Sequence, residues 1–302
     1  MEIGDWQSTQ DLNDVYREIE RLGLERQVME LDAYGFTVVE NMMDAQTVET
    51  ARQAICDICE KQTGRKPDLE AGEEHPNWRF VPYLMPRHEV FQDVMLNEKG
   101  LALITYLVGK SAQLFSMGCH FKGPGEGGEI SLHADASLPA PLPSYAVICN
   151  INYALTDYTK EGGCLAIVPG SHKLCRGPRP EESRLDAVHQ NPNAVPMEGP
   201  AGTAVIWHGN TWHGSFPRRI PGLRLNLAVP YARPFMKVQE RYGSELPQSV
   251  VDRNTHHPRF RQLVGLEDSY GWKEEGPRFL DQVNGGYKEE FVNRRAASGL
   301  YA

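Results

Sequence analysis

The chain has 302 residues, of which 40% are hydrophobic and 24% are charged, a composition typical of a folded enzyme and not of a disordered chain. The formal net charge of −9 argues against a nucleic-acid surface or an anionic membrane as partner. No apolar run reaches the roughly 18 residues that a spanning helix needs, and the acidic start lacks the features of a signal peptide. Six scattered cysteines suit a reducing compartment, so we expect a cytoplasmic protein.

The first part of the chain is predicted to be mainly helical. Apolar residues recur at helical spacing up to a turn at Gly35. Asp44 is a plausible N-cap for a helix that ends near Gly64, and a further helix is predicted over 90–108. The segment 65–87 between these helices is predicted to be a long surface loop, and loops of this length are often functional.

From residue 111 onward the apolar residues follow the period of strands. Short β-like runs are separated by turns rich in Gly and Pro, and lie at 113–121, 130–135, 145–155, 164–168, 203–207, 211–216 and 223–231. Helices followed by evenly spaced strands predict a mainly β fold, a jelly roll or barrel with a helical layer on one side. We expect one domain over 1–302, with a helical part at 1–110, a jelly-roll core at 111–235 and a C-terminal extension at 236–302.

The tripeptide His133-Ala134-Asp135 is the first candidate metal-binding feature. Residues i and i+2 of a strand point to the same face, so the imidazole and the carboxylate can bind one metal ion. The tripeptide alone is weak evidence, but His213 and Arg224 follow on the last two predicted strands. Two imidazoles and one carboxylate on one octahedral face are the ligands of non-haem Fe(II) oxygenases. A nearby guanidinium would bind a dicarboxylate co-substrate.

Taken together, these features resemble the phytanoyl-CoA dioxygenase family of Fe(II)/2-oxoglutarate-dependent oxygenases. Four segments carry the resemblance: 32–39, His133-Ala134-Asp135, 162–172, and His213 with Arg224. It covers roughly residues 30 to 235, and the run at 162–172 is its strongest single support. The resemblance implies a double-stranded β-helix (jelly-roll, cupin-like) core flanked by N-terminal and C-terminal helices. It also implies Fe(II), 2-oxoglutarate and O₂ as cofactor and co-substrates.

The resemblance implies roles residue by residue. It makes three residues the iron ligands and thereby the catalytic residues: His133, Asp135 and His213. Arg224 becomes the salt-bridge partner of the distal carboxylate of 2-oxoglutarate, and Ser215 a hydroxyl that hydrogen-bonds the same carboxylate. Asn152 falls where relatives place a side chain beside the co-substrate. Gln113 is a similar candidate from the preceding strand.

The long loop and a Pro-rich insert at 138–143 supply the candidates for the substrate pocket: Trp78, Arg79, Tyr83 and Leu138. The alternative for the loop residues is a plain surface location. Arg218 and Arg219 compete for the role of co-substrate anchor, but they lie in a predicted hairpin turn, and we expect both in a solvated loop. Trp207 and Trp212 are expected in the core or the pocket wall.

The resemblance implies a hydroxylase of a small organic molecule or secondary metabolite, which decarboxylates 2-oxoglutarate to succinate and CO₂. Desaturation, epoxidation and ring rearrangement use the same ligands and stay open. Family halogenases replace the carboxylate ligand by a small residue, so Asp135 disfavours halogenation. An acyl-CoA hydroxylase is an alternative that the net charge weakens. A non-redox cupin-like metal protein is a further alternative, but it needs no dicarboxylate anchor such as Arg224. The sequence indicates no oligomeric state.

Overall fold

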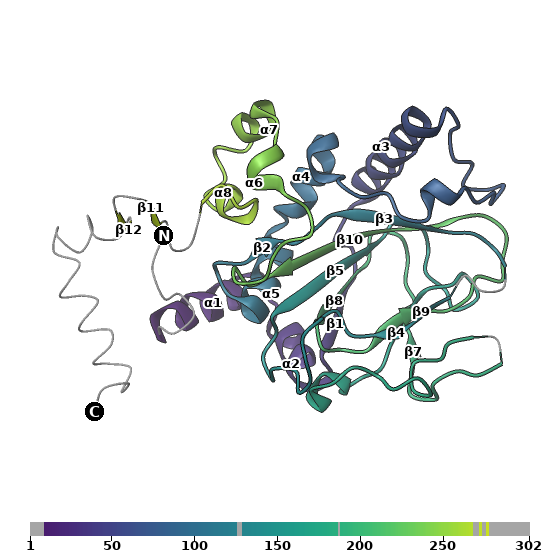
Figure 1. Cartoon of the computed structure of the whole chain (residues 1–302), viewed down its shortest axis with the longest axis horizontal. Coiled ribbons are helices and arrows are strands. Elements are labelled where there is room, and N and C mark those ends of the chain that lie inside the picture. Colours follow the sequence, from purple (N-terminus) through teal and green to yellow (C-terminus); the bar gives the residue numbers. More distant parts are fainter. Residues whose placement is uncertain (1–8, 126–128, 187, 268–271, 274–275, 278–302) are drawn as a thin grey trace.

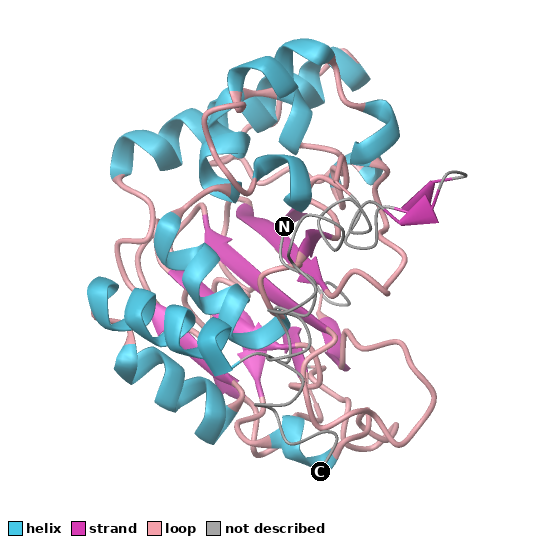
Figure 2. Cartoon of the chain, turned by 90° about the vertical axis from the view of Figure 1, so that its left-hand side faces the viewer, coloured by secondary structure: helices cyan, strands magenta, loops and turns pink. Residues whose placement is uncertain are grey.

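The computed structural model describes residues 9–125, 129–186, 188–267, 272–273 and 276–277. Within these ranges the core consists of two antiparallel sheets (Figure 1). Helices gather on one side of the larger sheet, as Figure 2 shows. None of the helices in these ranges is long and apolar enough to cross a membrane.

The helices of the first part lie close to where the apolar spacing predicts them. They are α1 (Thr9–Leu22), α2 (Glu25–Tyr34), α3 (Ala45–Thr63), α4 (Glu89–Met95) and α5 (Glu98–Val108). The predicted N-cap Asp44 accepts a hydrogen bond from the backbone N–H of Thr47 at 2.7 Å. The single helix predicted over 90–108 is wrong. The Asn97 side chain accepts from the backbone N–H of Gly100 at 3.0 Å and so caps a new helix, α5.

The segment between α3 and α4 is a loop that contains two short 3₁₀ turns, Pro76–Trp78 and Met85–Arg87. At the other end of the helical part, α2 ends at Gly35, whose φ is 82°. A Cβ atom at Gly35 would lie 2.4 Å from Nδ1 of His172. Glycine is therefore required here both by the backbone and by the close approach of the His172 segment.

The larger sheet has the order β1-β8-β5-β10-β2, and β3 also pairs with β10. Its strands are β1 (Phe36–Val39), β2 (Gln113–Leu114), β3 (Gly118–Lys122), β5 (Ile148–Ala154), β8 (Ala204–His208) and β10 (Arg224–Ala232). The smaller sheet has the order β4-β9-β6-β7, from β4 (Ile130–His133), β6 (Leu165–Ile167), β7 (Val195–Pro196) and β9 (His213–Ser215). The run predicted at 113–121 is thus two strands, which pair with different parts of β10.

Alternation along β5 shows how the larger sheet separates two environments. All seven residues of β5 are buried. Cys149, Ile151 and Tyr153 belong to the apolar cluster that includes the helices, whereas Asn150 and Asn152 line a cavity between the sheets. Because successive side chains of a strand point to opposite faces, one face of β5 supports the fold and the other carries polar groups inward.

The C-terminal segment contributes to the core on the helical side. It contains the short helices α6 (Tyr242–Glu245), α7 (Gln248–Arg253) and α8 (Phe260–Leu263), and the strands β11 (Trp272–Lys273) and β12 (Gly276–Pro277). In Figure 1 the three helices lie near α4. Tyr242, Phe260 and Leu263 are at most 2% exposed and belong to the same apolar cluster as α3 to α5.

Candidate metal centre

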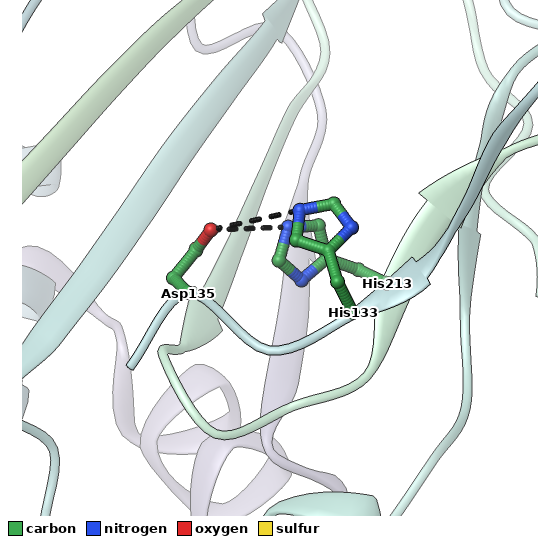
Figure 3. Close-up of side chains that lie close together, drawn as sticks. All are labelled: His133, Asp135 and His213. Atoms are coloured by element: carbon green, nitrogen blue, oxygen red, sulfur yellow. Dashed lines mark ion pairs between the residues drawn. The ribbon is translucent and has the colours of Figure 1, made fainter. Parts of the chain in front are cut away.

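Three side chains converge between the two sheets, as Figure 3 shows. His133 ends β4, His213 begins β9, and the two are register partners across this strand pair. Asp135 lies in the loop after β4 and not on the predicted strand, and its backbone N–H donates to the carbonyl of Gly209 at 2.8 Å. One potential ligand atom from each of the three residues lies within 4.8 Å of the others.

Both imidazoles are oriented by backbone carbonyls. Nδ1 of His133 lies 3.0 Å from the carbonyl oxygen of Ser131, and Nδ1 of His213 lies 2.9 Å from that of Thr211. A ring nitrogen that donates to a carbonyl carries the proton, so each Nε2 keeps its lone pair. The Nε2 atoms of His133 and His213 lie 3.9 and 3.4 Å from Oδ1 of Asp135. Two imidazole Nε2 atoms and one carboxylate oxygen thus face a common point, as a divalent transition metal requires.

Trp207 positions the carboxylate of this cluster. Its indole Nε1–H donates to Oδ2 of Asp135 at 3.0 Å, and its ring centroid lies 4.5 Å from that of His213. Burial alone would raise the pKa of the Asp135 carboxyl, but the two imidazoles and the indole N–H hold that pKa below its ordinary value. Asp135 is therefore ionised, with Oδ2 held by Trp207 and Oδ1 directed at the imidazoles.

Replacement of Trp207 by Phe is expected to weaken metal binding about 10- to 100-fold, because Oδ2 of Asp135 loses its donor while an aromatic ring remains. Calorimetric titration with Mn(II) measures the effect. Trp212→Phe is the matched control, since its indole N–H donates to the carbonyl of Arg176 instead. Equal weakening in both variants would show that indole packing, and not the bond to Asp135, is responsible.

A cavity of about 500 Å³ extends from these three side chains, and Arg224 and Ser215 line it. Arg224, 2% exposed, donates through Nη1 to the hydroxyl of Tyr158 at 3.1 Å. That hydroxyl donates to Oδ1 of Asn152 at 3.0 Å. Among the described residues, Nε of Arg224 has no hydrogen-bond partner. A buried guanidinium with a free donor is suited to a planar carboxylate.

The hydroxyl of Ser215 lies ready to donate to the same anion. Its Oγ accepts from Nζ of Lys122 at 2.5 Å and from the backbone N–H of Ile130 at 3.3 Å. Since a hydroxyl carries one proton of its own, that proton is available for a ligand. No motif marked Tyr158 or Lys122 in the sequence, because their proximity to Arg224 depends on strand register and on the course of a loop.

Gln113 is one predicted site residue that the structure places elsewhere. β2 pairs with the far end of β10, where Gln113 is opposite Ala232. Arg224 is at the other end of this nine-residue strand, about 25 Å away. Gln113 does not line the cavity, whereas Asn152, the other predicted neighbour of the co-substrate, does.

The four substrate-pocket candidates do not line this cavity either. Trp78 is 2% exposed in the apolar core, and Leu138 packs against a separate small cluster. Tyr83 donates from its backbone N–H to Glu240. Arg79 lines an adjoining cavity of about 410 Å³. The long loop reaches the first cavity through Phe80 instead, because side-chain direction in an irregular loop cannot be read from the sequence.

The prediction of a solvated Arg218 is wrong. Its side chain is buried, and it donates to the carbonyls of Gly222 at 2.7 Å and Gly162 at 3.0 Å. Arg218 thus closes the turn before β10, and its side chain does not line the cavity. Arg219 is about half exposed, at 49%, and lies 3.8 Å from Glu161, as expected for a loop residue.

Comparison with known proteins gives consistent matches. The family model described as phytanoyl-CoA dioxygenase (PhyH) matches residues 31–225. The ectoine dioxygenase of Stutzerimonas stutzeri (strain A1501) is 25% identical over 278 residues, which cover 81% of this chain and 89% of the relative.

Two solved structures illustrate the likeness in fold. HygX from Streptomyces hygroscopicus with nickel and 2-oxoglutarate bound has a TM-score of 0.59 at 19% identity, over 72% of this chain and 89% of HygX. The epimerase SnoN in complex with Fe³⁺, alpha ketoglutarate and nogalamycin RO has a TM-score of 0.52 at 20% identity, over 71% and 85%. The predicted mainly β fold with a jelly-roll core and flanking helices is confirmed.

Proposed function

The chain belongs to the phytanoyl-CoA dioxygenase family, and from this premise we propose that it is an Fe(II)- and 2-oxoglutarate-dependent oxygenase that hydroxylates a small organic molecule. The observation that carries the proposal is the convergence of His133, Asp135 and His213 beside the buried guanidinium of Arg224. A non-redox metal protein would need the three ligands but no buried anchor for a dicarboxylate. The combination therefore favours the oxygenase.

The donor set fits Fe(II). Two imidazoles with free Nε2 lone pairs and one ionised carboxylate would hold the metal by one face and leave three positions for ligands. When bound, the metal supplies the activation of O₂ and the oxidising power for C–H hydroxylation. Asp135 fills the position that family halogenases leave to chloride, which favours oxygenation.

The residues of the chain bind and orient the co-substrate. Arg224 would pair with the distal carboxylate of 2-oxoglutarate, and Ser215 would donate its hydroxyl proton to the same group. Tyr158 and Asn152 fix the guanidinium through the two hydrogen bonds from Arg224 to Tyr158 and from Tyr158 to Asn152. Holding the reacting groups in one geometry, away from bulk water, is the contribution that a protein makes to such chemistry.

The remaining cavity wall favours an uncharged substrate. It carries aromatic, aliphatic and amide side chains, among them Phe80, Phe115, Ile148, Asn150 and Gln239. His120 also lines it, and burial, with a smaller contribution from Arg224, lowers the pKa of His120 to about 4, so this ring is neutral. Besides the proposed ligands and Arg224, no charged side chain among the described residues lines the cavity. An acyl-CoA, with several phosphates, is less suited to this wall.

The names of the similar proteins agree with a small-molecule substrate. One curated relative is an ectoine dioxygenase, and one structural neighbour is an epimerase crystallised with nogalamycin RO. The epimerase also shows that proteins of this fold carry out reactions other than hydroxylation. The ligand set and the anion anchor serve several such reactions, and among them we propose hydroxylation for this chain.

Anaerobic addition of Fe(II) and 2-oxoglutarate is expected to produce a metal-to-ligand charge-transfer band in the visible spectrum. Absence of the band at saturating concentrations would rule out the proposed site. A panel of uncharged, anionic and CoA-linked small molecules is then tested for stimulated succinate release. We expect stimulation by an uncharged compound, with one oxygen atom from ¹⁸O₂ in its product. Loss of two hydrogens without oxygen incorporation would indicate desaturation instead.

A further inference from the structure

Two buried basic side chains lie side by side on neighbouring strands of the larger sheet, next to the first cavity. Lys122, the last residue of β3, is the register partner of Arg224, the first residue of β10. Directly opposite residues of an antiparallel pair project to the same face of the sheet. Arg224 lines both the cavity between the sheets and the adjoining cavity of about 410 Å³, and Lys122 lines the adjoining one. The exposed fractions of Lys122 and Arg224 are 4% and 2%.

Lys122 and Arg224 both donate hydrogen bonds to uncharged acceptors. Nζ of Lys122 donates to Oγ of Ser215 at 2.5 Å and to the carbonyl of Phe216 at 2.7 Å. Arg224 donates to the hydroxyl of Tyr158, and its Nε has no partner among the described residues. Burial of an uncompensated charge is costly and two adjacent charges repel each other, so both side chains are charged together only when an anion lies beside them. The arrangement therefore favours an anion as ligand.

The charges around Lys122 support this reading. Burial, followed by Arg224, lowers the pKa of the Lys122 ammonium to about 6, whereas Glu129 and Glu74 raise it by smaller amounts. Of these two carboxylates, Glu74 already accepts from the backbone N–H of Gly123 at 2.7 Å. Lys122 is therefore predominantly neutral in the free protein above this pH, and a carboxylate between it and Arg224 would favour its charged form.

We propose that Lys122 is a second cationic residue of the co-substrate site, which binds the distal carboxylate of 2-oxoglutarate together with Arg224 and Ser215. The hydroxyl of Ser215 accepts a hydrogen bond from Lys122, and its own proton remains available for the carboxylate. This inference rests on the proposed function and adds to it a residue that discriminates dicarboxylates from 2-oxo acids with an uncharged tail.

Two 2-oxo acids test this proposal. 2-Oxoglutarate and 2-oxobutyrate share the keto-acid end that chelates a metal, but only 2-oxoglutarate has a distal carboxylate. Anaerobic, Fe(II)-loaded protein is titrated with each compound, and binding is followed by the charge-transfer band and by calorimetry. Lys122→Met is expected to raise the Kd of 2-oxoglutarate about 10- to 100-fold, the effect of one charge-assisted hydrogen bond. The Kd of 2-oxobutyrate should stay within about twofold, because that compound does not reach Lys122.

Two further variants serve as controls. Lys122→Arg keeps the charge and is expected to recover part of the lost affinity for 2-oxoglutarate. Lys160→Met removes a neighbouring exposed lysine, whose Nζ lies 5.0 Å from the ring centroid of Phe216, and should change neither Kd. If Lys122→Met does not fold, Lys122→Gln, which keeps N–H donors for the carbonyl of Phe216, is measured in its place with the same expectation.

The outcomes separate this inference from the proposed function. If the neutral variant binds 2-oxoglutarate as tightly as the wild type, or loses affinity for both 2-oxo acids equally, Lys122 has only a structural role and the inference is overturned. If the wild-type protein gives a band with neither compound, the proposed function itself fails. Selective loss of 2-oxoglutarate binding supports both.

Discussion

Replacement of His213 by Ala is expected to abolish 2-oxoglutarate decarboxylation and to weaken metal binding by more than about 100-fold. Removal of a residue that only hydrogen-bonds a metal ligand typically lowers metal affinity by about 10- to 100-fold. Removal of a ligand itself should therefore lower the affinity by more. His213 is one of two imidazoles that face Asp135, with Nε2 at 3.4 Å from Oδ1. Without it, two donors remain, and one of them is the half-exposed His133, whose side chain is 47% exposed.

The His213→Ala variant is measured by calorimetric titration with Mn(II) and by the visible band with Fe(II) and 2-oxoglutarate. Thermal unfolding checks that the variant is folded. His256→Ala is the control, because His256 is exposed and its ring lies against the carbonyl of Arg253, far along the chain from the cluster. A His213→Ala protein that keeps wild-type affinity for the metal would contradict the assignment of His213 as a ligand.

Replacement of Arg224 by Met is expected to raise the Kd of 2-oxoglutarate at least about 100-fold. The substitution removes a buried charge and the free Nε donor, and keeps most of the apolar volume of the side chain. Two charge-assisted hydrogen bonds to one carboxylate contribute roughly 1.5–3 kcal/mol each, so their joint loss accounts for this factor. Metal binding should change little, because Arg224 donates to the hydroxyl of Tyr158 and not to any of the three proposed ligands.

Arg219→Met is the matched control for this prediction. Arg219 lies five residues earlier in the same hairpin, is about half exposed and pairs loosely with Glu161 at 3.8 Å. It should leave the Kd of 2-oxoglutarate unchanged. If Arg219→Met weakens binding as much as Arg224→Met does, the charge of the hairpin and not a specific anchor would explain the affinity.

The regular helices and the positions of the strands along the chain follow from local patterns. Apolar spacing and the cap at Asp44 define α3, and the Gly- and Pro-rich turns separate the strands of the two sheets. The continuous apolar period predicts a single helix over 90–108. A single side chain, Asn97, divides it, and local capping hydrogen bonds of this kind compete with helix continuation.

The sequence predicts those site residues that belong to short motifs. His133 and Asp135 are two residues apart in the chain. His213 and Arg224 lie on β9 and β10, which belong to different sheets, so it was the family resemblance that grouped them with the first pair. The prediction of Gln113 beside the co-substrate differs from the structure, because the sequence does not show which end of β10 pairs with β2. A shift of strand register moves a side chain by several residues along its neighbour, without any change in apolar pattern.

The sequence by itself therefore determined the family, the mainly β fold and the three candidate ligands with their anchor. Only the tertiary structure decided which side chains complete the site. Trp207 holds the carboxylate of Asp135, Tyr158 holds Arg224, and Lys122 lies beside it, each from a strand or loop distant in the chain. The physical reason is that ligand types and spacing are local properties of a motif, whereas the charge and hydrogen bonding of a buried site depend on which strands pair and in which register.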